Sequence, residues 1–167
     1  MNSLRSMPSG TRVFVDTNIF VLAQNDRGAI GQTCRDFFTR IGRQDIQGFT
    51  STAVAAETIH REMVLEAREQ LSLSSQAIVE YLQMHPELVQ QLRRHLTVPS
   101  YIRRLGVDIL PVMVKDLHTS KSVRSNFGLM TNDSLIVAVM RTHKLRHLAT
   151  HDAGFAQVTG IQVWRPT

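Results

Sequence analysis

The stretch "VFVDTNIFVLA", residues 13–23, is an apolar run that three polar residues interrupt. Residues 12–16 are short, β-branched and aromatic, which is typical of a buried parallel strand. Asp16, Thr17 and Asn18 then predict the end of that strand and the start of a helix. Because ligand sites in open parallel sheets form beyond the carboxyl ends of the strands, we expect Asp16 to lie at a functional edge.

The rest of the chain alternates between strand-like and helical segments. Strands are predicted at 46–50, 107–112, 146–152 and 161–164. Helices are predicted at 33–41, from Ser51 onwards, at 75–96 with a break near Pro86, at 114–126 and at 132–144. Such alternation indicates an α/β fold whose parallel sheet is covered by helices on both faces. At 167 residues the chain is expected to form one domain with a sizeable core.

Charge is distributed unevenly along the chain. The formal net charge is +5, yet residues 57–92 hold six Glu against two Arg, whereas residues 93–147 hold ten Lys or Arg against three Asp. A basic surface in the second half makes a polyanion a natural partner, although the same charges also suit solvated helix faces. The N-terminal "MNSLRSMPSG" lacks an apolar signal region and no stretch is apolar enough to span a bilayer, so we expect a soluble, cytoplasmic protein with no membrane contact.

Three further acids occupy positions comparable to that of Asp16. Asp152 in "LATHDAGF" follows a short apolar strand, and Asp133 in "TNDSLIVAV" opens an apolar helix. Glu57 lies in the second turn of the helix that begins near Ser51. Taken singly, each acid has a structural explanation as a cap, a turn residue, a favourable charge near a helix N-terminus or a solvated side chain. Taken together, they are expected to converge, because a parallel sheet brings these element ends towards one edge.

Convergence of four carboxylates carries an electrostatic cost. Two carboxylates about 4 Å apart repel each other by about 4 kcal/mol at an effective dielectric constant near 20. No lysine or arginine lies within the four motifs to neutralise them. Either some of the acids stay protonated or a divalent cation binds between them. Oxygen ligands without Cys, and without a spaced His pair, favour Mg²⁺ or Mn²⁺ over Zn²⁺.

The ordered set "VFVDTNIF", "AAETIH", "MTNDSLIVAV" and "LATHDAGF" resembles the PIN-domain family of nucleases, in particular the VapC-like toxins of bacterial toxin–antitoxin systems. The resemblance covers residues 12–60 and 107–165. Residues from about 70 to 105 are interpreted as a helical insertion or extension within a single PIN-like domain, 1–167. The resemblance implies a three-layer α/β/α sandwich with a central, mainly parallel sheet. It also implies a Mg²⁺- or Mn²⁺-dependent ribonuclease that hydrolyses RNA phosphodiester bonds.

The resemblance also assigns roles to individual residues. The acids expected to be catalytic and to bind metal are Asp16, Glu57, Asp133 and Asp152. Asn18 and Thr150 match accessory polar positions of the family. His151 is less typical at its position, where it suits either proton transfer and phosphate contact or an exposed loop. The candidate RNA contacts in the basic region, for which solvated helix faces are an equal alternative, are Arg93, Arg94, Arg103, Arg104, Lys121 and Arg124.

The expected mechanism divides the acids into two groups. Asp16, Asp133 and Asp152 are expected to hold or orient the main metal ion, while Glu57 positions water or a second ion. By its resemblance, the protein is further expected to form a homodimer and to be held inactive by a cognate antitoxin protein. A stand-alone PIN nuclease that processes RNA would carry the same acids.

Two other classes of protein fit the sequence less well. An aspartate after the first strand also suggests a haloacid-dehalogenase-type phosphatase, but that chemistry needs a second acid two residues later, where this chain has Asn18. A non-catalytic RNA-binding domain is the other alternative, since a fold can persist without its activity. A module that only binds a polyanion gains nothing from clustered negative charge, which argues against this alternative.

Overall fold

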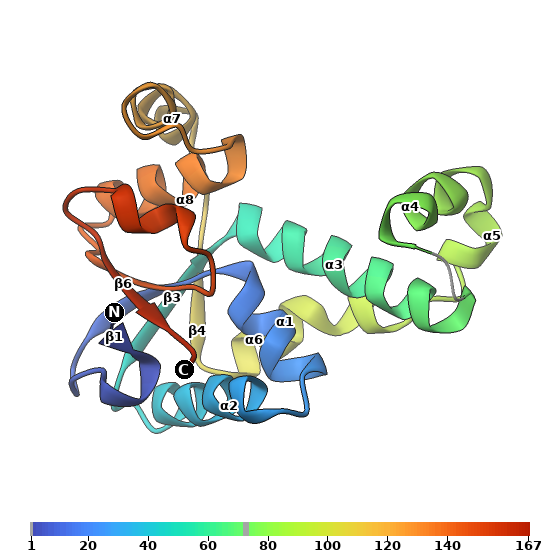
Figure 1. The fold of residues 1–167 in the computed structure, drawn as a ribbon, viewed down its shortest axis with the longest axis horizontal. Helices are drawn as coiled ribbons and strands as arrows, with labels where there is room; N and C mark the ends of the chain where they lie inside the picture. Colours follow the sequence, from blue (N-terminus) through green and yellow to red (C-terminus); the bar gives the residue numbers. More distant parts are fainter. Residues whose placement is uncertain (1, 72–73) are drawn as a thin grey trace.

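The computed structural model of the protein describes residues 2–71 and 74–167. Within these ranges six strands form one sheet, in the order β1-β6-β5-β2-β3-β4, and every neighbouring pair is parallel (Figure 1). The strands are β1 (Asn2–Ser3), β2 (Arg12–Val15), β3 (Gln47–Ser51), β4 (Val107–Leu110), β5 (His147–Ala149) and β6 (Gln162–Arg165). The parallel sheet confirms the predicted α/β class, and only the two-residue edge strand β1 was not predicted.

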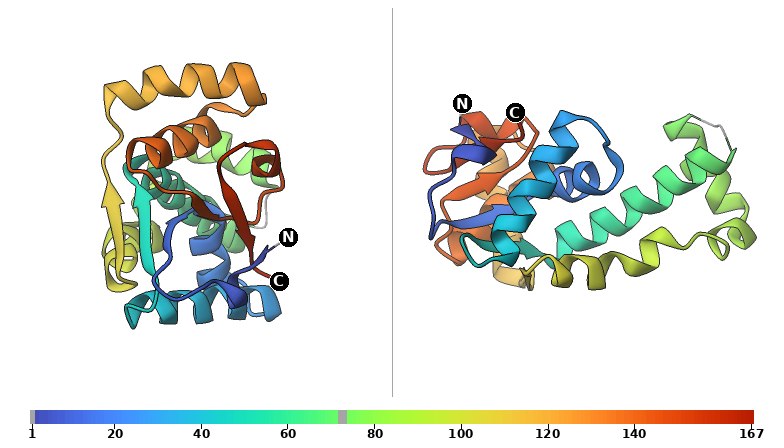
Figure 2. Two further views of the ribbon diagram at one scale, coloured as in Figure 1. Left: turned by 90° about the vertical axis from the view of Figure 1, so that its left-hand side faces the viewer. Right: turned by 90° about the horizontal axis from the view of Figure 1, so that it is seen from below.

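Helices cover both faces of this sheet (Figures 1 and 2). One face carries α1 (Thr17–Asn25) and α2 (Ala29–Gly42), and the other carries α8 (Thr131–Thr142), with α7 (Val114–Phe127) packed outside α8. The remaining helices are α3 (Thr52–Leu71), α4 (Ser75–Met84), α5 (Pro86–Val89), α6 (Val98–Arg104) and the 3-10 helices η1 (Leu4–Ser6), η2 (Arg94–Thr97) and η3 (Gly154–Gln157). The predicted three-layer α/β/α sandwich is therefore confirmed. Among the described residues, no helix combines the length and the apolar character needed to cross a bilayer.

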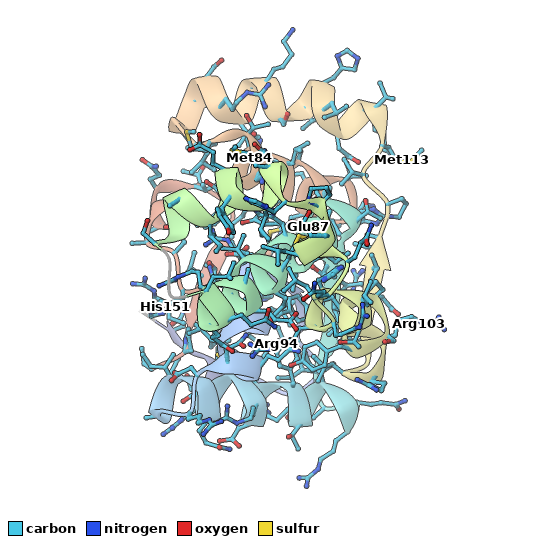
Figure 3. All side chains as sticks on the ribbon, turned by 90° about the vertical axis from the view of Figure 1, so that its right-hand side faces the viewer. Met84, Glu87, Arg94, Arg103, Met113 and His151 are labelled. Carbon is cyan, nitrogen blue, oxygen red and sulfur yellow. The ribbon has the colours of Figure 1, made fainter. Side chains whose placement is uncertain are left out.

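Helix α3 extends from the sheet and carries a helical arm at its far end (Figure 1). Figure 3 looks at this end of the molecule, where Met84 of α4 and Glu87 of α5 are labelled. The arm has its own small hydrophobic cluster, separate from the main core, whose buried members are Ala67, Ile78, Leu82 and Leu92. The chain then returns along α3 through η2 and α6 (Figure 2).

The helix predicted at 75–96 is interrupted more than expected. A break near Pro86 is confirmed, because α4 ends at Met84 and Pro86 is the first residue of α5. However, residues 90–93 are not helical, and the chain restarts as the short 3-10 helix η2. The physical reason is a long-range contact: the buried carboxylate of Glu66 accepts hydrogen bonds from the backbone N–H groups of Arg93 and Arg94. Glu66 of α3 thus caps η2, although the two are more than twenty residues apart in the sequence.

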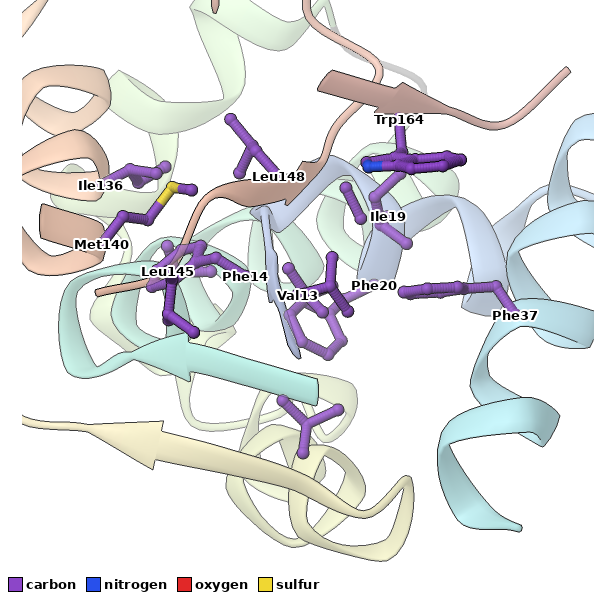
Figure 4. Packing of buried hydrophobic residues seen from close by; sticks show 14 of the residues in the cluster. Val13, Phe14, Ile19, Phe20, Phe37, Ile136, Met140, Leu145, Leu148 and Trp164 are labelled. Atoms are coloured by element: carbon purple, nitrogen blue, oxygen red, sulfur yellow. The ribbon is translucent and has the colours of Figure 1, made fainter. Parts of the chain in front are cut away.

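The main core lies between the sheet and the two helical layers (Figure 4). Phe14 of β2 and Leu148 of β5 are fully buried within the sheet. The rings of Phe20 and Phe38 stack across α1 and α2 on one side, with centroids 5.2 Å apart. On the opposite side, Met140 of α8 is fully buried against the sheet. Packing on both faces fixes the carboxyl ends of β2 and β5, where the polar residues begin.

Candidate active site

The order of the strands creates a crevice at the carboxyl ends of β2 and β5. From β2 the chain passes to β3 and β4 on one side of the sheet, and it later returns to β5 and β6 on the other side. Ligands of open α/β sheets bind where the strand order reverses in this way. Asp16 directly follows β2, and Thr150 directly follows β5. Both residues therefore lie at the position where such a fold forms its site.

Asp16 is held in place through both of its carboxylate oxygens. It is only 6% exposed and caps α1, with Oδ1 accepting a hydrogen bond of 2.7 Å from the backbone N–H of Thr17. Oδ2 accepts hydrogen bonds of 2.6 Å from Asn18 Nδ2 and from Thr150 Oγ1. The pKa of Asp16 is raised to about 6, chiefly by burial and to a smaller extent by the charges of Glu57 and Asp133, against the lowering effect of the hydrogen bonds from Thr150 and Thr17.

The hydroxyl of Thr150 joins three chain segments. Thr150 is fully buried, and while it donates to Asp16 it accepts hydrogen bonds from Asn18 Nδ2 at 3.1 Å and from the backbone N–H of Asp152 at 3.0 Å. Asn18 makes a second link, because its Oδ1 accepts a 2.8 Å hydrogen bond from the backbone N–H of His151. The two accessory residues thus fasten the loop after β5 to the start of α1.

Glu57 reaches the same region from α3. One carboxylate oxygen accepts a 3.2 Å hydrogen bond from Asn132 Nδ2, and the other lies 3.5 Å from Nη2 of Arg61. Asn132 immediately precedes Asp133 in the first turn of α8, where α3 packs against α8. The contact with Asn132 therefore brings the second and third acidic motifs together.

Asp133 and Asp152 complete the acidic set. Asp133 is half-buried in the first turn of α8, and its burial, together with the charges of Asp152 and Glu57, raises its pKa. Asp152 is exposed, and its Oδ1 accepts a 2.7 Å hydrogen bond from the backbone N–H of Gly154, which orders the loop after β5. Burial is the largest cause of the raised pKa of both Asp16 and Asp133, and the charges of neighbouring acids add to it.

The acids surround one cavity of about 260 Å³. Its lining residues are Asp16, Thr17, Asn18, Val21, Leu22, Glu57, Arg61, Asp133, His151 and Asp152. The first and last of these acids, Asp16 and Asp152, are more than a hundred residues apart in the sequence, yet all four line this cavity. Thr150 lies behind Asp16 rather than on the cavity wall, and His151 is exposed at its edge.

The donor atoms of this cavity fit a hard divalent cation. Within the described part of the chain, no three His, Cys, Asp or Glu side chains are already grouped as ligands around one point. A spread set of carboxylates still suits Mg²⁺, which usually keeps several waters and binds proteins through one or two carboxylates. Thr17 supplies a further observation: its buried hydroxyl faces no hydrogen-bond partner within the described protein, although the residue lines the cavity. A divalent cation held among the acids would offset their mutual repulsion.

The six basic residues considered as RNA contacts do not line the cavity. Arg94 forms an ion pair with Glu69, with Nη1 and Oε1 2.9 Å apart, and Arg124 donates hydrogen bonds to Ser120 and Ser134. The other four, which are all exposed, are Arg93, Arg103, Arg104 and Lys121. Figure 3 shows Arg103 and His151 on opposite sides of the molecule. Three of the six therefore have hydrogen-bond partners, since Arg93 Nη1 also donates to the backbone carbonyl of Gln90 at 2.7 Å. The six residues are spread over η2 and the residue before it, α6 and α7.

Sequence reasoning missed two residues of the site. Asn132 and Arg61 each contact Glu57, and Arg61 also lines the cavity. Arg61 directly follows the second acidic motif, which ends at His60, and was therefore not counted with that motif. Helical spacing was the available signal, since residues four apart on a helix lie on the same face.

Comparison with known proteins supports the fold. The family model of the PIN domain matches residues 13–161. No curated protein is a significant match in sequence. Among solved structures, VapBC2 from Rickettsia felis, bound to a DNA fragment from its promoter, superposes with a TM-score of 0.59 and 16% identity, covering 93% of this chain and 98% of that one.

Two further solved structures are similar over nearly their whole length. VapC20 from Mycobacterium tuberculosis, a toxin that cleaves the sarcin–ricin loop, has a TM-score of 0.58 and 14% identity, with coverage of 90% of this chain and 98% of that one. FitAcB from Neisseria gonorrhoeae has a TM-score of 0.56 and 17% identity, with coverage of 92% and 97%. At such identities these structures show that the fold is shared.

Proposed function

The chain belongs to the PIN-domain family, and from this premise we propose that it is a Mg²⁺- or Mn²⁺-dependent endoribonuclease that hydrolyses RNA phosphodiester bonds. The supporting observation is that acids from four separate chain segments line one cavity at the carboxyl ends of β2 and β5. Neither a core role nor a capping role accounts for four carboxylates facing one space, because their repulsion is unfavourable without a cation.

Each polar residue of the cavity has a role in this reaction. Asp16, Asp133 and Asp152 would hold the ion, directly or through water, and Glu57 would accept a hydrogen bond from the attacking water. When bound, Mg²⁺ or Mn²⁺ supplies the Lewis acidity that favours hydroxide near neutral pH and shields the charge that builds up on the phosphate. Asn18 and Thr150 would act as positioning residues: both donate hydrogen bonds to the carboxylate of Asp16, and the hydrogen bond from Thr150 favours its ionised form.

The function is tested by incubating the purified protein with total RNA, with EDTA, Mg²⁺ or Mn²⁺, and mapping the cut ends. Cleavage is expected only with a divalent ion, and it should be lost in Asp16→Asn, Glu57→Gln and Asp133→Asn variants that keep the wild-type circular dichroism spectrum. Metal-dependent cleavage by Asp16→Asn at the wild-type rate would refute the assignment. Tight RNA binding without any cleavage would favour a non-catalytic PIN module instead.

A more specific function, the toxin of a type II toxin–antitoxin system, is supported by the fold. Solved structures that share it include VapBC2, FitAcB and a toxin–antitoxin complex from Klebsiella pneumoniae. By analogy, a cognate antitoxin protein would hold this chain inactive. Growth arrest on expression, lost in Asp16→Asn and relieved by the product of the adjacent gene, is the expected result. Normal growth with an active nuclease would favour a stand-alone RNA-processing enzyme.

The family resemblance also supports an assembly and a surface for the substrate. We expect a homodimer, which light scattering of the purified protein measures directly. We expect residues 1–167 to behave as one domain, with the arm at about 70–105 as an extension, so that thermal unfolding follows a single transition. Flanking RNA phosphates would contact the basic residues that have no structural partner in the arrangement described above, Arg103, Arg104 and Lys121, and these contacts would weaken as salt rises.

A further inference from the structure

Arg61 is the single Lys or Arg among the described residues that line the acidic cavity. It lies one helical turn after Glu57 on α3, so its side chain projects from the same face of that helix. Every other charged group on the cavity wall is a carboxylate, apart from His151 at the edge. An RNA phosphate that enters this cavity therefore meets four negative side chains and one guanidinium.

The guanidinium of Arg61 is available for a ligand. Within residues 2–71 and 74–167 its one ion-pair partner is Glu57, with Nη2 and Oε1 3.5 Å apart, and 62% of its side chain is exposed. An exposed ion pair between residues four apart on a helix contributes little to stability, so exchanging this partner costs little. Glu57 does not depend on the pair for its position, because Asn132 holds its other carboxylate oxygen. Arg61 can thus leave Glu57 without displacing it.

We propose that Arg61 binds a phosphate of the RNA substrate at the mouth of the cavity and so brings the chain past the four acids. A guanidinium suits this task because it presents a planar fork of donors to phosphate oxygens and stays charged at all relevant pH values. This role rests on the proposed nuclease function, since it names a substrate contact of the same site. It adds a contact that none of the four acidic motifs contains.

RNA binding measured in the absence of metal tests this contact separately from catalysis. A fluorescein-labelled single-stranded RNA oligonucleotide of mixed sequence is titrated in EDTA and followed by fluorescence anisotropy. The variants are Arg61→Gln and Arg61→Lys, with Arg68→Gln as the matched control. Arg68 is an exposed residue of the same helix that does not line the cavity, so its replacement removes the same charge elsewhere.

Arg61→Gln is expected to raise Kd by about tenfold or more, whereas Arg68→Gln raises it by about twofold or less. The slope of log Kobs against log salt concentration should fall by about 0.7 for Arg61→Gln, which corresponds to one lost phosphate contact on a single strand. Arg61→Lys should lie between the wild type and Arg61→Gln, because lysine keeps the charge without the fork. In cleavage assays, Arg61→Gln should raise KM more than it lowers kcat.

A double-mutant cycle separates a direct phosphate contact from an effect through Glu57. If Arg61 contacts the phosphate, Arg61→Gln weakens binding by the same factor in the wild-type and Glu57→Gln backgrounds. Loss of its effect in the Glu57→Gln background would mean that Arg61 only positions Glu57, and it would overturn the inference. Equal Kd values for Arg61→Gln and Arg68→Gln, or no RNA binding by the wild type, would do the same.

These outcomes distinguish the inference from the function on which it rests. If the wild-type protein cleaves RNA while Arg61→Gln and Arg68→Gln bind RNA alike, the nuclease function is supported and the proposed role of Arg61 is refuted. If the wild-type protein binds RNA through Arg61 but never cleaves it, the nuclease function is refuted and the phosphate contact of Arg61 is supported.

Discussion

Asp16 is expected to make the folded protein less stable at neutral pH than in mild acid. Burial raises its pKa from 3.8 to about 6, so the folded state holds this proton more tightly than the unfolded chain does. Between these two values the folded state binds more protons, and the free energy of unfolding falls as the pH rises. At neutral pH the free energy of unfolding is therefore lower by about 3 kcal/mol than it is below both pKa values, since one pKa unit equals about 1.4 kcal/mol.

Urea denaturation followed by circular dichroism, in EDTA and at a series of pH values from below 3.8 to neutral, measures this loss. The wild type should lose about 3 kcal/mol more than Asp16→Asn across the series, because the amide does not titrate. In thermal scans each kcal/mol corresponds to roughly 2–4 °C for a domain of this size. Asp108→Asn is the matched control, because Asp108 is an exposed aspartate of β4 outside the acidic cavity.

The same experiment detects the ion without measuring activity. Mg²⁺ or Mn²⁺ at neutral pH should stabilise the wild type by mass action, and the stabilisation should be much smaller in Asp16→Asn. Identical pH dependence in the wild type and Asp16→Asn would refute the reasoning about burial. Equal stabilisation of both proteins by the ion would refute the role of Asp16 as a ligand.

Three other substitutions test the framework around the site. Thr150→Val removes a hydrogen bond that lowers the pKa of Asp16, so the pH–rate profile of RNA cleavage should move to higher pH; an unchanged profile contradicts this. Glu66→Ala leaves the backbone N–H groups of Arg93 and Arg94, at the start of η2, without their acceptor and should lower the free energy of unfolding by about 2 kcal/mol in urea, a loss that Glu66→Gln partly restores. Gly31→Ala would place a Cβ 2.0 Å from a backbone carbonyl oxygen and should cost about 3 kcal/mol or more, whereas Gly42→Ala, with no atom within 4 Å, should not; similar melting temperatures for the two would contradict the packing argument.

The strands and the positions of the acids could be predicted because their signals are local. A β-branched or aromatic run that ends in a polar residue identifies both β2 with Asp16 and β5 with its following loop. The helix predicted to start near Ser51 begins at Thr52, and the Ser51 hydroxyl accepts a 3.3 Å hydrogen bond from the N–H of Val54. Parallel pairing then decides which element ends meet, since it puts all the carboxyl ends on one edge of the sheet.

The features that could not be predicted depend on partners distant in sequence. Nothing near residues 90–97 shows that Glu66 will cap η2 from across the arm. Arg94 pairs with Glu69, and Arg124 donates hydrogen bonds to two serines. A count of basic residues in the sequence cannot tell such partnered side chains from those that face solvent. Strand β1 has only two residues and exists because its neighbour β6 lies beside it.

The site has two sides that are supported in different ways. On one side, Asp16, Asn18 and Thr150 are tied to the sheet and to one another by short hydrogen bonds. On the other side, Glu57 and its neighbour Asn132 are carried on two helices, one of which continues without interruption into the arm. Substitutions in the arm would consequently change the width of the opening while its floor kept one shape.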